Sequence, residues 1–451
     1  MSAFGSGPRA VAERPSPQAF TPLASLPLSW HPNLWHPTTQ VATSPEPWKV
    51  VRAQGCMLEL DDGRQLIDAI SSWWVTLHGH AEPAIAAAIG RQAHELEQVI
   101  FANFSHTPAE QLATRLAALT ELERLFFSDN GSTAVEVALK IAWQWWRNQG
   151  SERRQLIAFE GAYHGDTFGA MAVGDRSIFT APYDELLFDV ARISWPHTHW
   201  GDASVEVREA QALLQLEQAL ATPTAAVILE PLIQGAAGMH MVRPAFLRAV
   251  EERVRNSGAL LIADEVMTGF GRSGALLASQ RAGIKPDLMA LSKGLTGGFL
   301  PMGVTMASER LYRGFISQQP EHTFFHGHSF TANPLGCAAA LASLDLLQHN
   351  PERYQQFESR HTPLLEELAE RSARVQKPRC VGTVAAFELD AGNSSYLNPI
   401  GKQLQRLCLN HGVYLRPLGN VVYLLPPLCI SEAQLQQCYE AISASIESLE
   451  S

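Results

Sequence analysis

The sequence has few of the features that mark membrane, secreted or nucleic-acid-binding proteins. Among its 451 residues, no apolar run approaches the ~20 residues that a helix needs to span a bilayer. The N-terminal segment lacks the unbroken apolar stretch of a secretory signal. Basic residues are not clustered and the formal net charge is −11, which argues against nucleic acid and anionic membrane surfaces. We therefore expect neither as a partner.

Cysteine is also scarce. The six cysteines are scattered, with no CxxC pair, and this pattern favours reduced thiols in a cytoplasmic protein over disulfides or a zinc site. Three histidines, His322, His326 and His328, stand close together in HTFFHGHSFTANP. No carboxylate or thiolate lies among them, so we predict no metal site there.

The composition is that of a globular protein with a large core, since 46% of the residues are hydrophobic and 18% are charged. The length allows a large domain plus a smaller one. Residues 1–28 are rich in Pro, Ser, Gly and Ala without periodicity, and we predict a mobile tail there. From about residue 350, helical patterns alternate with short strand patterns, which indicates a second, smaller α+β domain.

Two apolar runs in the segment 259–298 have the length and flanks of buried parallel strands. Leu260–Ala263 ends in the carboxylate Asp264, and Leu288–Leu291 is followed by the lone amine Lys293. The ends of parallel strands meet at one edge of a sheet, where ligands bind. An amine there can form a Schiff base with an aldehyde, and an acid can hold a protonated pyridine nitrogen, as pyridoxal phosphate chemistry requires. The alternative is that the acid caps a turn and the lysine is solvated.

A second pattern suggests an anion site. Leu125–Phe127 has the pattern of a short strand, and a helix with a regular apolar stripe follows from Gly131–Thr133. Thr133 and Glu136 have the spacing of a capping box, which marks the start of a helix. Free backbone N–H groups at that start would attract a phosphate. An ordinary strand–helix turn remains the alternative.

Three further side chains are candidates for a binding site. Tyr163 lies between glycines after a predicted strand, where it could stack on a planar cofactor or simply fill the core. Trp73 and Trp74 are adjacent, so one of the two indoles could line a pocket while the other packs in the core. Arg416 lies in a predicted turn, where a rigid guanidinium suits either a substrate carboxylate or a surface ion pair.

The glycines at 269, 271 and 274 match the dinucleotide pattern GxGxxG. We reject this interpretation because the glycines of that motif follow a strand directly and open a helix. Here Asp264 and Glu265 intervene, and two carboxylates would repel a pyrophosphate.

Taken together, SDNGSTAVEVALK, GAYHGDT, ILEP, ADEVMTGFGRSG, LSKGLTGG and HGHSFTANP are similar to the motifs of class III aminotransferases, which are pyridoxal phosphate enzymes of fold type I. The resemblance spans about residue 30 to about residue 440. It implies an α/β fold with a large cofactor-binding domain over residues 71–345, built on a mainly parallel seven-stranded sheet. Residues 29–70 and 346–451 would then form a small α+β domain from both chain ends.

The resemblance also implies roles for the candidates. Lys293 would hold the cofactor covalently and shuttle the proton, and Asp264 would pair with the pyridinium nitrogen. Tyr163 would stack on one face of the ring, and Val266 would pack on the other. The phosphate ligands within the chain would be Gly131 and Ser132.

A homodimer with shared active sites is implied as well, since His328 and Ser329 would reach the phosphate of the neighbouring subunit. The substrate would be contacted by Trp73, Tyr163, Gly327, Lys293, Arg416 and Thr38.

Within this family, ISSWW and RPLGNVVYLLPP resemble the branch that acts in biotin biosynthesis. The acceptor would be 8-amino-7-oxononanoate, with its distal carboxylate on Arg416, and the donor would be S-adenosylmethionine or lysine. The donor stays open because Thr38 stands where the branch usually has a tyrosine. His328 likewise stands where many of these enzymes have proline.

Three alternatives remain at this stage. The chain could be another class III enzyme acting on acetylornithine, ornithine or a 4-aminobutyrate-like ω-amine, or an aminomutase. It could be a binding or regulatory protein of the same fold without catalysis, although Lys293 and Asp264 argue against that. A nicotinamide oxidoreductase is the weakest alternative because of the rejected glycine pattern.

Overall fold

The computed structural model describes residues 30–31, 33–392 and 396–450, so the predicted tail over residues 1–28 lies outside the described residues. The chain divides into two compact units, residues 1–50 and residues 51–451. In the first unit, the indole of Trp30 packs edge-on against the ring of His36, with centroids 5.2 Å apart. Thr38 belongs to this unit and has a left-handed backbone, with φ of 50°. The second unit holds the sheets and helices that follow.

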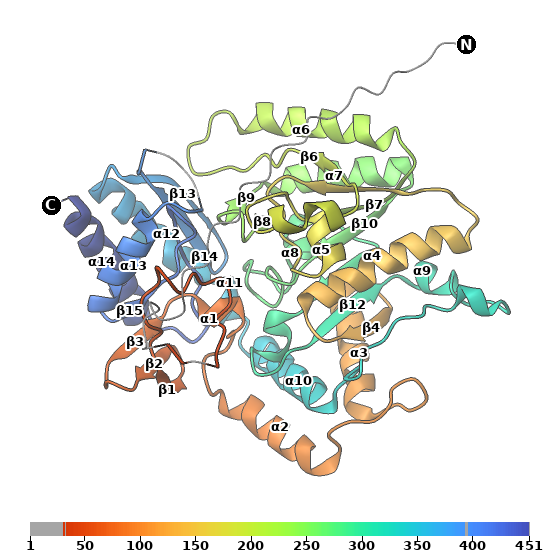
Figure 1. The fold of residues 1–451 in the computed structure, drawn as a ribbon, viewed down its shortest axis with the longest axis horizontal. Helices are drawn as coiled ribbons and strands as arrows, with labels where there is room; N and C mark the ends of the chain where they lie inside the picture. The colour runs from red at the N-terminus through yellow and green to blue at the C-terminus, as the bar shows by residue number, and fades with distance from the viewer. Residues whose placement is uncertain (1–29, 32, 393–395, 451) are drawn as a thin grey trace, which may run out of the picture. The chain divides into compact units, whose positions relative to one another are not determined.

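A seven-stranded sheet is the centre of the second unit (Figure 1). All neighbouring strands run parallel except at β12, which is antiparallel to both of its neighbours. The predicted mainly parallel seven-stranded sheet is therefore confirmed. In spatial order the strands are β4 (Arg124–Ser128), β12 (Gly303–Ala307), β11 (Leu288–Leu291), β10 (Leu260–Asp264), β7 (Thr224–Leu229), β5 (Gln155–Phe159) and β6 (Ala191–Ile193).

The central strands are continuous apolar runs because helices cover both faces of the sheet. Every residue of β7, β10, β11 and β12 is buried. Successive side chains of β10 point to opposite faces. Leu260 and Ile262 pack with α4 (Gly131–Asn148), whereas Leu261 packs with α7 (Pro244–Ser257). The strand ends are thus fixed by packing on two sides.

The other helices of this region are α1 (Ser71–Trp74), α2 (Pro83–Glu95), α3 (Thr107–Thr120), α5 (Phe168–Val173), α6 (Val205–Leu220), α8 (Ala278–Ala282), α9 (Glu309–Arg313) and α10 (Pro334–His349), with 3-10 turns at Ala181–Leu186, Lys293–Thr296 and Pro320–His322 and a small hairpin of β8 (Ile233–Gln234) and β9 (His240–Met241). Helix α2 ends at Glu95 because the backbone of Leu96 is extended.

Strands from both ends of the chain share a sheet of order β1-β2-β3-β15, in which β3 pairs in parallel with β15. In Figure 1 the red β2 and β3 accordingly lie near the blue C-terminal helices. This pairing supports a small domain built from both ends, while its predicted boundaries stay a prediction. The strands are β1 (Val50–Gln54), β2 (Met57–Leu60), β3 (Gln65–Asp68) and β15 (Val413–Tyr414).

A three-stranded sheet and four helices complete the C-terminal part. Two of these helices meet at Gln356, where ψ is −1°. Across the described residues, no helix combines the length and apolar character that crossing a bilayer requires. The elements are β13 (Val375–Val381), β14 (Val384–Leu389), β16 (Val421–Leu424), α11 (Glu352–Gln355), α12 (Phe357–Arg371), α13 (Ile400–Asn410) and α14 (Glu432–Glu450).

Candidate active site

A cavity of about 680 Å³ opens at the carboxyl edge of the large sheet. Residues that follow five of the strands (β4, β5, β7, β10 and β11) converge on it, as expected for a ligand site in a parallel sheet. The lining residues are Trp74, Val75, Asn130, Gly131, Ser132, Tyr163, His164, Gly165, Asp166, Thr167, Glu230, Asp264, Val266, Met267, Ser292, Lys293, Gly298, Phe299, Leu300, Pro301 and Met302.

The end of β10 places Asp264 in this cavity, as the sequence predicted. One carboxylate oxygen accepts a hydrogen bond from the backbone N–H of Val266 at 3.0 Å. The other lies 2.7 Å from Nδ1 of His164, which is fully buried. Burial lowers the pKa of His164, but the hydrogen bond and charge of Asp264 outweigh this effect and leave the pKa raised. Val266 and His164 therefore fix the orientation of the Asp264 carboxyl group.

Lys293 lines the same cavity and comes two residues after the end of β11. Its backbone is left-handed, with φ of 42°, a strained conformation for a non-glycine residue that is enriched at active sites. Burial lowers the pKa of Lys293 to about 8, although the charges of Asp264 and Glu230 oppose this shift. A lysine with this pKa is a better nucleophile and proton acceptor near neutral pH than a solvated one.

Trp74, rather than Trp73, lines the cavity. The Nζ of Lys293 lies 4.6 Å from the centroid of the Trp74 ring, within cation–π range. The indole N–H donates to the hydroxyl of Tyr423 at 3.0 Å, which fixes the ring plane. Sequence reasoning left open which of the two indoles faces a pocket. The backbone conformation decides which indole lines the cavity: Ser72 and Trp74, the two neighbours of Trp73, are both left-handed, with φ of 59° and 67°.

Glu230 is a functional candidate that sequence reasoning missed, although it belongs to the ILEP motif. Its two carboxylate oxygens accept the backbone N–H groups of Tyr163 and Gly235, each at 3.2 Å. Burial raises the pKa of Glu230 to about 7, with a further increase from the charge of Asp264. A carboxyl with this pKa changes charge near neutral pH inside the cavity.

The start of α4, where the sequence predicts an anion site, lies at the cavity, but its cap differs from the prediction. Asn130 is the N-cap: its side chain accepts from the N–H of Thr133 at 3.0 Å, and the Thr133 hydroxyl accepts from the N–H of Asn130 at 3.0 Å. The predicted Thr133–Glu136 box is wrong because Glu136 accepts instead from Thr167 and Ala170. Gly131 and Ser132, which precede the capped residue Thr133, line the cavity, and the first N–H groups of a helix have no partner within the helix.

Thr167 is a second residue that sequence reasoning missed. Its N–H donates to Oγ of Ser132 at 3.0 Å, and the two hydroxyl oxygens are 2.7 Å apart. Gly165 makes this approach possible, since a Cβ there would lie 2.3 Å from the Ser132 hydroxyl. The GAYHGDT segment thus completes the cradle, and the glycine in the motif was the available signal.

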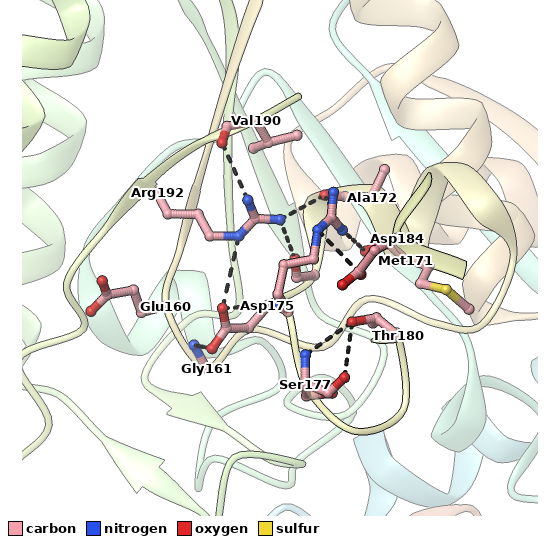
Figure 2. A network of polar contacts seen from close by, with 12 residues as sticks. Glu160, Gly161, Met171, Ala172, Asp175, Ser177, Thr180, Asp184, Val190 and Arg192 are labelled. Atoms are coloured by element: carbon pink, nitrogen blue, oxygen red, sulfur yellow. Dashed lines mark hydrogen bonds and ion pairs between the residues drawn. The ribbon is translucent and has the colours of Figure 1, made fainter. Parts of the chain in front are cut away.

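The segment that carries Tyr163 is held by a network of polar contacts behind it (Figure 2). Asp175 accepts the N–H of Gly161 at 2.8 Å. Arg192 lies 3.8 Å from the Asp175 carboxylate and donates to the carbonyl oxygen of Ala172 at 3.0 Å. These contacts fix the turn after β5, so that Tyr163 lines the cavity.

Several residues that were predicted to contact the substrate, or the phosphate of the neighbouring subunit, lie away from the cavity lining. Trp73 is 43% exposed, and the guanidinium of Arg416 lies 4.4 Å from its ring centroid. Nδ1 of His328 lies 3.3 Å from the carboxylate of Asp129, next to the cradle. The remaining ones are Gly327 and Ser329, both exposed, and Thr38, which belongs to the other unit.

Two other sequence patterns, the glycines at 269–274 and the histidines at 322–328, make contacts within the protein. Glu265 is buried and caps α8 by accepting the amides of Ala278 and Ser279, so a protein carboxylate occupies the helix start that a pyrophosphate would need. His326 lies within hydrogen-bond distance of Lys140 and His328. In the part of the chain that the structure describes, no three His, Cys, Asp or Glu side chains are grouped to hold a metal.

Comparison with known proteins identifies the class. The profile of the aminotransferase class-III family matches residues 38–446, so the chain belongs to this family. It is a pyridoxal phosphate-dependent aminotransferase of fold type I. The site fits that cofactor. An amine and a carboxylate lie in one cavity, and the start of α4 lies beside Gly165, where any side chain would clash with Ser132.

Among the relatives, the chain is 56% identical to the adenosylmethionine-8-amino-7-oxononanoate aminotransferase of Synechococcus elongatus, over 91% of this chain and 97% of that protein. It is 37% identical to the enzyme of the same name from Geobacter sulfurreducens, over 90% and 93% of the two chains. The solved structure of the enzyme of that name from Methanocaldococcus jannaschii matches with a TM-score of 0.86 at 31% identity, over 92% and 97%. An amine transaminase from an uncultivated Pseudomonas species, in its PLP-bound form, matches with a TM-score of 0.87 at 31% identity, over 93% and 99%.

Proposed function

We propose that this aminotransferase transfers an amino group from S-adenosylmethionine to the ketone of 8-amino-7-oxononanoate, forming 7,8-diaminononanoate for biotin biosynthesis. The observation that carries the proposal is the 56% identity, over nearly the full length of both chains, to an enzyme named for these two compounds. The cavity and its charged groups supply what such a transfer needs.

Pyridoxal phosphate, when bound, carries the transferred nitrogen and stabilises the charge that develops when a proton leaves the adjacent carbon. In this chain Lys293 would hold the cofactor and move that proton. Its lowered pKa, about 8, leaves part of the amine neutral near neutral pH. The Nζ atom of Lys293 lies 4.6 Å from the centroid of the Trp74 ring.

The other lining residues would hold the cofactor in place. Asp264, fixed by His164, would pair with the ring nitrogen, and the amides of Gly131 and Ser132 would bind the phosphate. We also propose that the two cavity walls formed by Tyr163 and Val266 sandwich the ring. Their common membership of the cavity lining supports this arrangement.

The acceptor carboxylate is proposed to bind Arg416. The guanidinium is oriented by the face of Trp73, whose neighbour in sequence, Trp74, lines the cavity. This arrangement would place the apolar chain of the substrate along indole surface. The proposed substrate contacts of Gly327 and Thr38 rest on family resemblance alone.

We further propose a homodimer whose active sites are shared through His328 and Ser329. Exposed apolar side chains surround this segment, and Gln98 links it to the 98–104 segment by donating to the carbonyl oxygen of Ser329 at 3.2 Å. A second copy that covered this surface would bury its large side chains, Ile100, Phe104, Phe325 and Phe330. The six unbonded cysteines support a cytoplasmic location.

One half-reaction tests the substrate assignment. The visible absorbance of the cofactor-loaded enzyme is followed after separate additions of S-adenosylmethionine, lysine and 7,8-diaminononanoate. We expect S-adenosylmethionine and 7,8-diaminononanoate to bleach it, because each would donate its amino group. Lysine serves as the comparison donor because Thr38 replaces the tyrosine usual in the branch.

The other outcomes discriminate clearly. Bleaching by lysine but not by S-adenosylmethionine would overturn the donor and keep the acceptor. Bleaching by ornithine or 4-aminobutyrate, with none by 7,8-diaminononanoate, would favour an ω-amine substrate of the kind implied by the likeness to the amine transaminase.

A further inference from the structure

Two thiols that are far apart in the sequence meet outside the active site. The sulfur atoms of Cys56 and Cys429 are 3.4 Å apart, although 373 residues separate them in the chain. Both cysteines are unbonded, and neither lines the cavity. Cys56 directly precedes β2, and Cys429 follows β16 in the C-terminal part of the chain. A bond between them would join the two ends of the fold.

The backbone around the pair leaves the sulfurs little room to separate. Gly55 and His80 exchange two backbone hydrogen bonds, of 3.0 and 2.7 Å. A Cβ on Gly79 would lie 2.6 Å from the sulfur of Cys429, so glycine is what lets the thiol pack onto this turn. The turn is therefore a fixed wall behind Cys429.

The two thiols differ in access and in acidity. Cys56 is 3% exposed, whereas Cys429 is partly exposed. The hydrogen bond with Cys56 and the charge of Arg353 lower the pKa of Cys429. The same hydrogen bond and burial raise the pKa of Cys56. Cys429 is thus the thiol that a dissolved reagent reaches and that reacts first as a thiolate.

We propose that Cys56 and Cys429 are a modification site, at which the two residues form a reversible disulfide with each other. The oxidant is a small disulfide such as oxidised glutathione. The Cys429 thiolate attacks one glutathione sulfur, breaks the glutathione disulfide and releases one glutathione. The Cys56 thiolate then attacks the Cys429 sulfur and displaces the second glutathione. The two protons lost by the cysteines end on the two glutathione thiols, and the two electrons reduce the oxidant.

The bond would secure both sides of the segment that positions Trp74. The carbonyl oxygen of Cys56 accepts the N–H of Asp68 at 2.7 Å, and the N–H of Leu428 donates to the carbonyl oxygen of Leu77 at 2.8 Å. These contacts bracket the turn that carries Trp74 into the cavity. Oxidation should therefore raise the thermal unfolding midpoint, because it closes a very long loop in the unfolded chain.

The test uses the cofactor-loaded, full-length enzyme in buffers of graded ratios of oxidised to reduced glutathione. Free thiols are then blocked with iodoacetamide, and the protein is examined by intact mass and by non-reducing peptide mapping. We expect two fewer carbamidomethyl groups than in the reduced protein, one peptide that joins Cys56 to Cys429, and a raised unfolding midpoint. Dithiothreitol should reverse all three.

Three variants sharpen the test. Cys429→Ser should abolish the bond and leave no glutathione adduct on buried Cys56. Cys56→Ser should stop at a stable glutathione adduct on Cys429. Cys337→Ser is the matched control, since Cys337 is buried in α10, and it should form the bond as the wild type does.

Absence of the joined peptide in wild type at the most oxidising ratio would overturn the proposal, as would a joined peptide formed by a different pair. If Cys56→Ser does not fold, the Cys429→Ser variant still decides the question, because the thiol that this substitution removes is partly exposed in the wild type. Two cysteines that still escape alkylation on oxidation of Cys429→Ser would then overturn it.

Discussion

At the scale of single residues, the centre of the site is an amine that burial makes reactive. Removing the amine should remove catalysis while leaving the phosphate cradle, which is built by a different helix. In Lys293→Ala, we expect turnover to fall by at least roughly 10²–10⁴-fold, the usual contribution of a positioned acid–base group. The variant should still bind the cofactor without a covalent link, as detected by equilibrium dialysis.

A matched control is Lys285→Ala, because Lys285 is exposed and pairs only at the surface with Glu121. Its turnover should equal that of the wild type. Turnover near the wild-type rate in Lys293→Ala would contradict the role assigned to this amine.

A second prediction concerns Arg416, which is proposed to bind the carboxylate of the acceptor. A lysine at 416 keeps the charge of Arg416 but loses the planar fork that stacks on Trp73 and can bind a carboxylate through two bonds. In Arg416→Lys, we expect KM for 8-amino-7-oxononanoate to rise roughly 10-fold, about 1.4 kcal/mol. The donor half-reaction, measured by bleaching, should change little because S-adenosylmethionine lacks the distal carboxylate of the acceptor.

Arg406→Lys, at an exposed position of α13, controls for a general effect of the substitution. An unchanged KM in Arg416→Lys would place the acceptor carboxylate elsewhere.

At the scale of elements, the start of α4 and the loop after β5 form one cradle. Gly165 has φ of 124°, and a Cβ there would lie 2.3 Å from the Ser132 hydroxyl. Gly165→Ala should therefore push Ser132 and the amide at the helix start out of place. We expect cofactor affinity, measured by fluorescence titration, to fall by 10-fold or more, or about 1.4 kcal/mol, and the unfolding midpoint to drop.

Gly150→Ala separates backbone strain from the cradle. Gly150 also has a left-handed backbone, with φ of 68°, but a Cβ there would meet nothing within 4 Å. This control should lose roughly 1 kcal/mol of stability and no cofactor affinity. Equal losses of affinity in the two variants would show that strain alone explains the effect.

At the scale of the whole molecule, Glu230 links stability to pH. Its pKa in the folded protein, about 7, lies above the ordinary value of 4.5. The folded state therefore holds a proton that the unfolded state loses. The resulting stabilisation is fully present below pH 4.5 and is lost as pH rises through 7. Its size is on the order of 3 kcal/mol, at about 1.4 kcal/mol per pKa unit.

Glu230→Gln removes this titration in the apoenzyme. The variant loses one hydrogen bond to a backbone N–H, which is a cost that does not depend on pH. We expect wild type to lose stability relative to the variant between pH 5 and pH 8, as measured by urea unfolding at each pH. A difference between the two proteins that stays constant across this range would show that the carboxyl is already ionised at pH 5.

Much of the architecture follows from local patterns. Leu260–Asp264 and Leu288–Leu291 are strands because apolar runs of that length, closed by polar residues, fit a sheet covered on both faces. The place of Lys293 at a sheet edge followed from the same pattern. The cap of α4 was only partly predicted, since Glu136 had a competing partner on another loop, Thr167, that no local pattern reveals.

The sequence by itself determined the order of the elements, the edge of the sheet that carries the chemistry, and the family. Only the tertiary structure decided which groups meet: His164 with Asp264 across 100 residues, and Cys56 with Cys429 across 373. The physical reason is that periodicity and capping depend on near neighbours in the chain. Contacts, burial and the pKa values that follow from burial depend on how distant segments pack against one another.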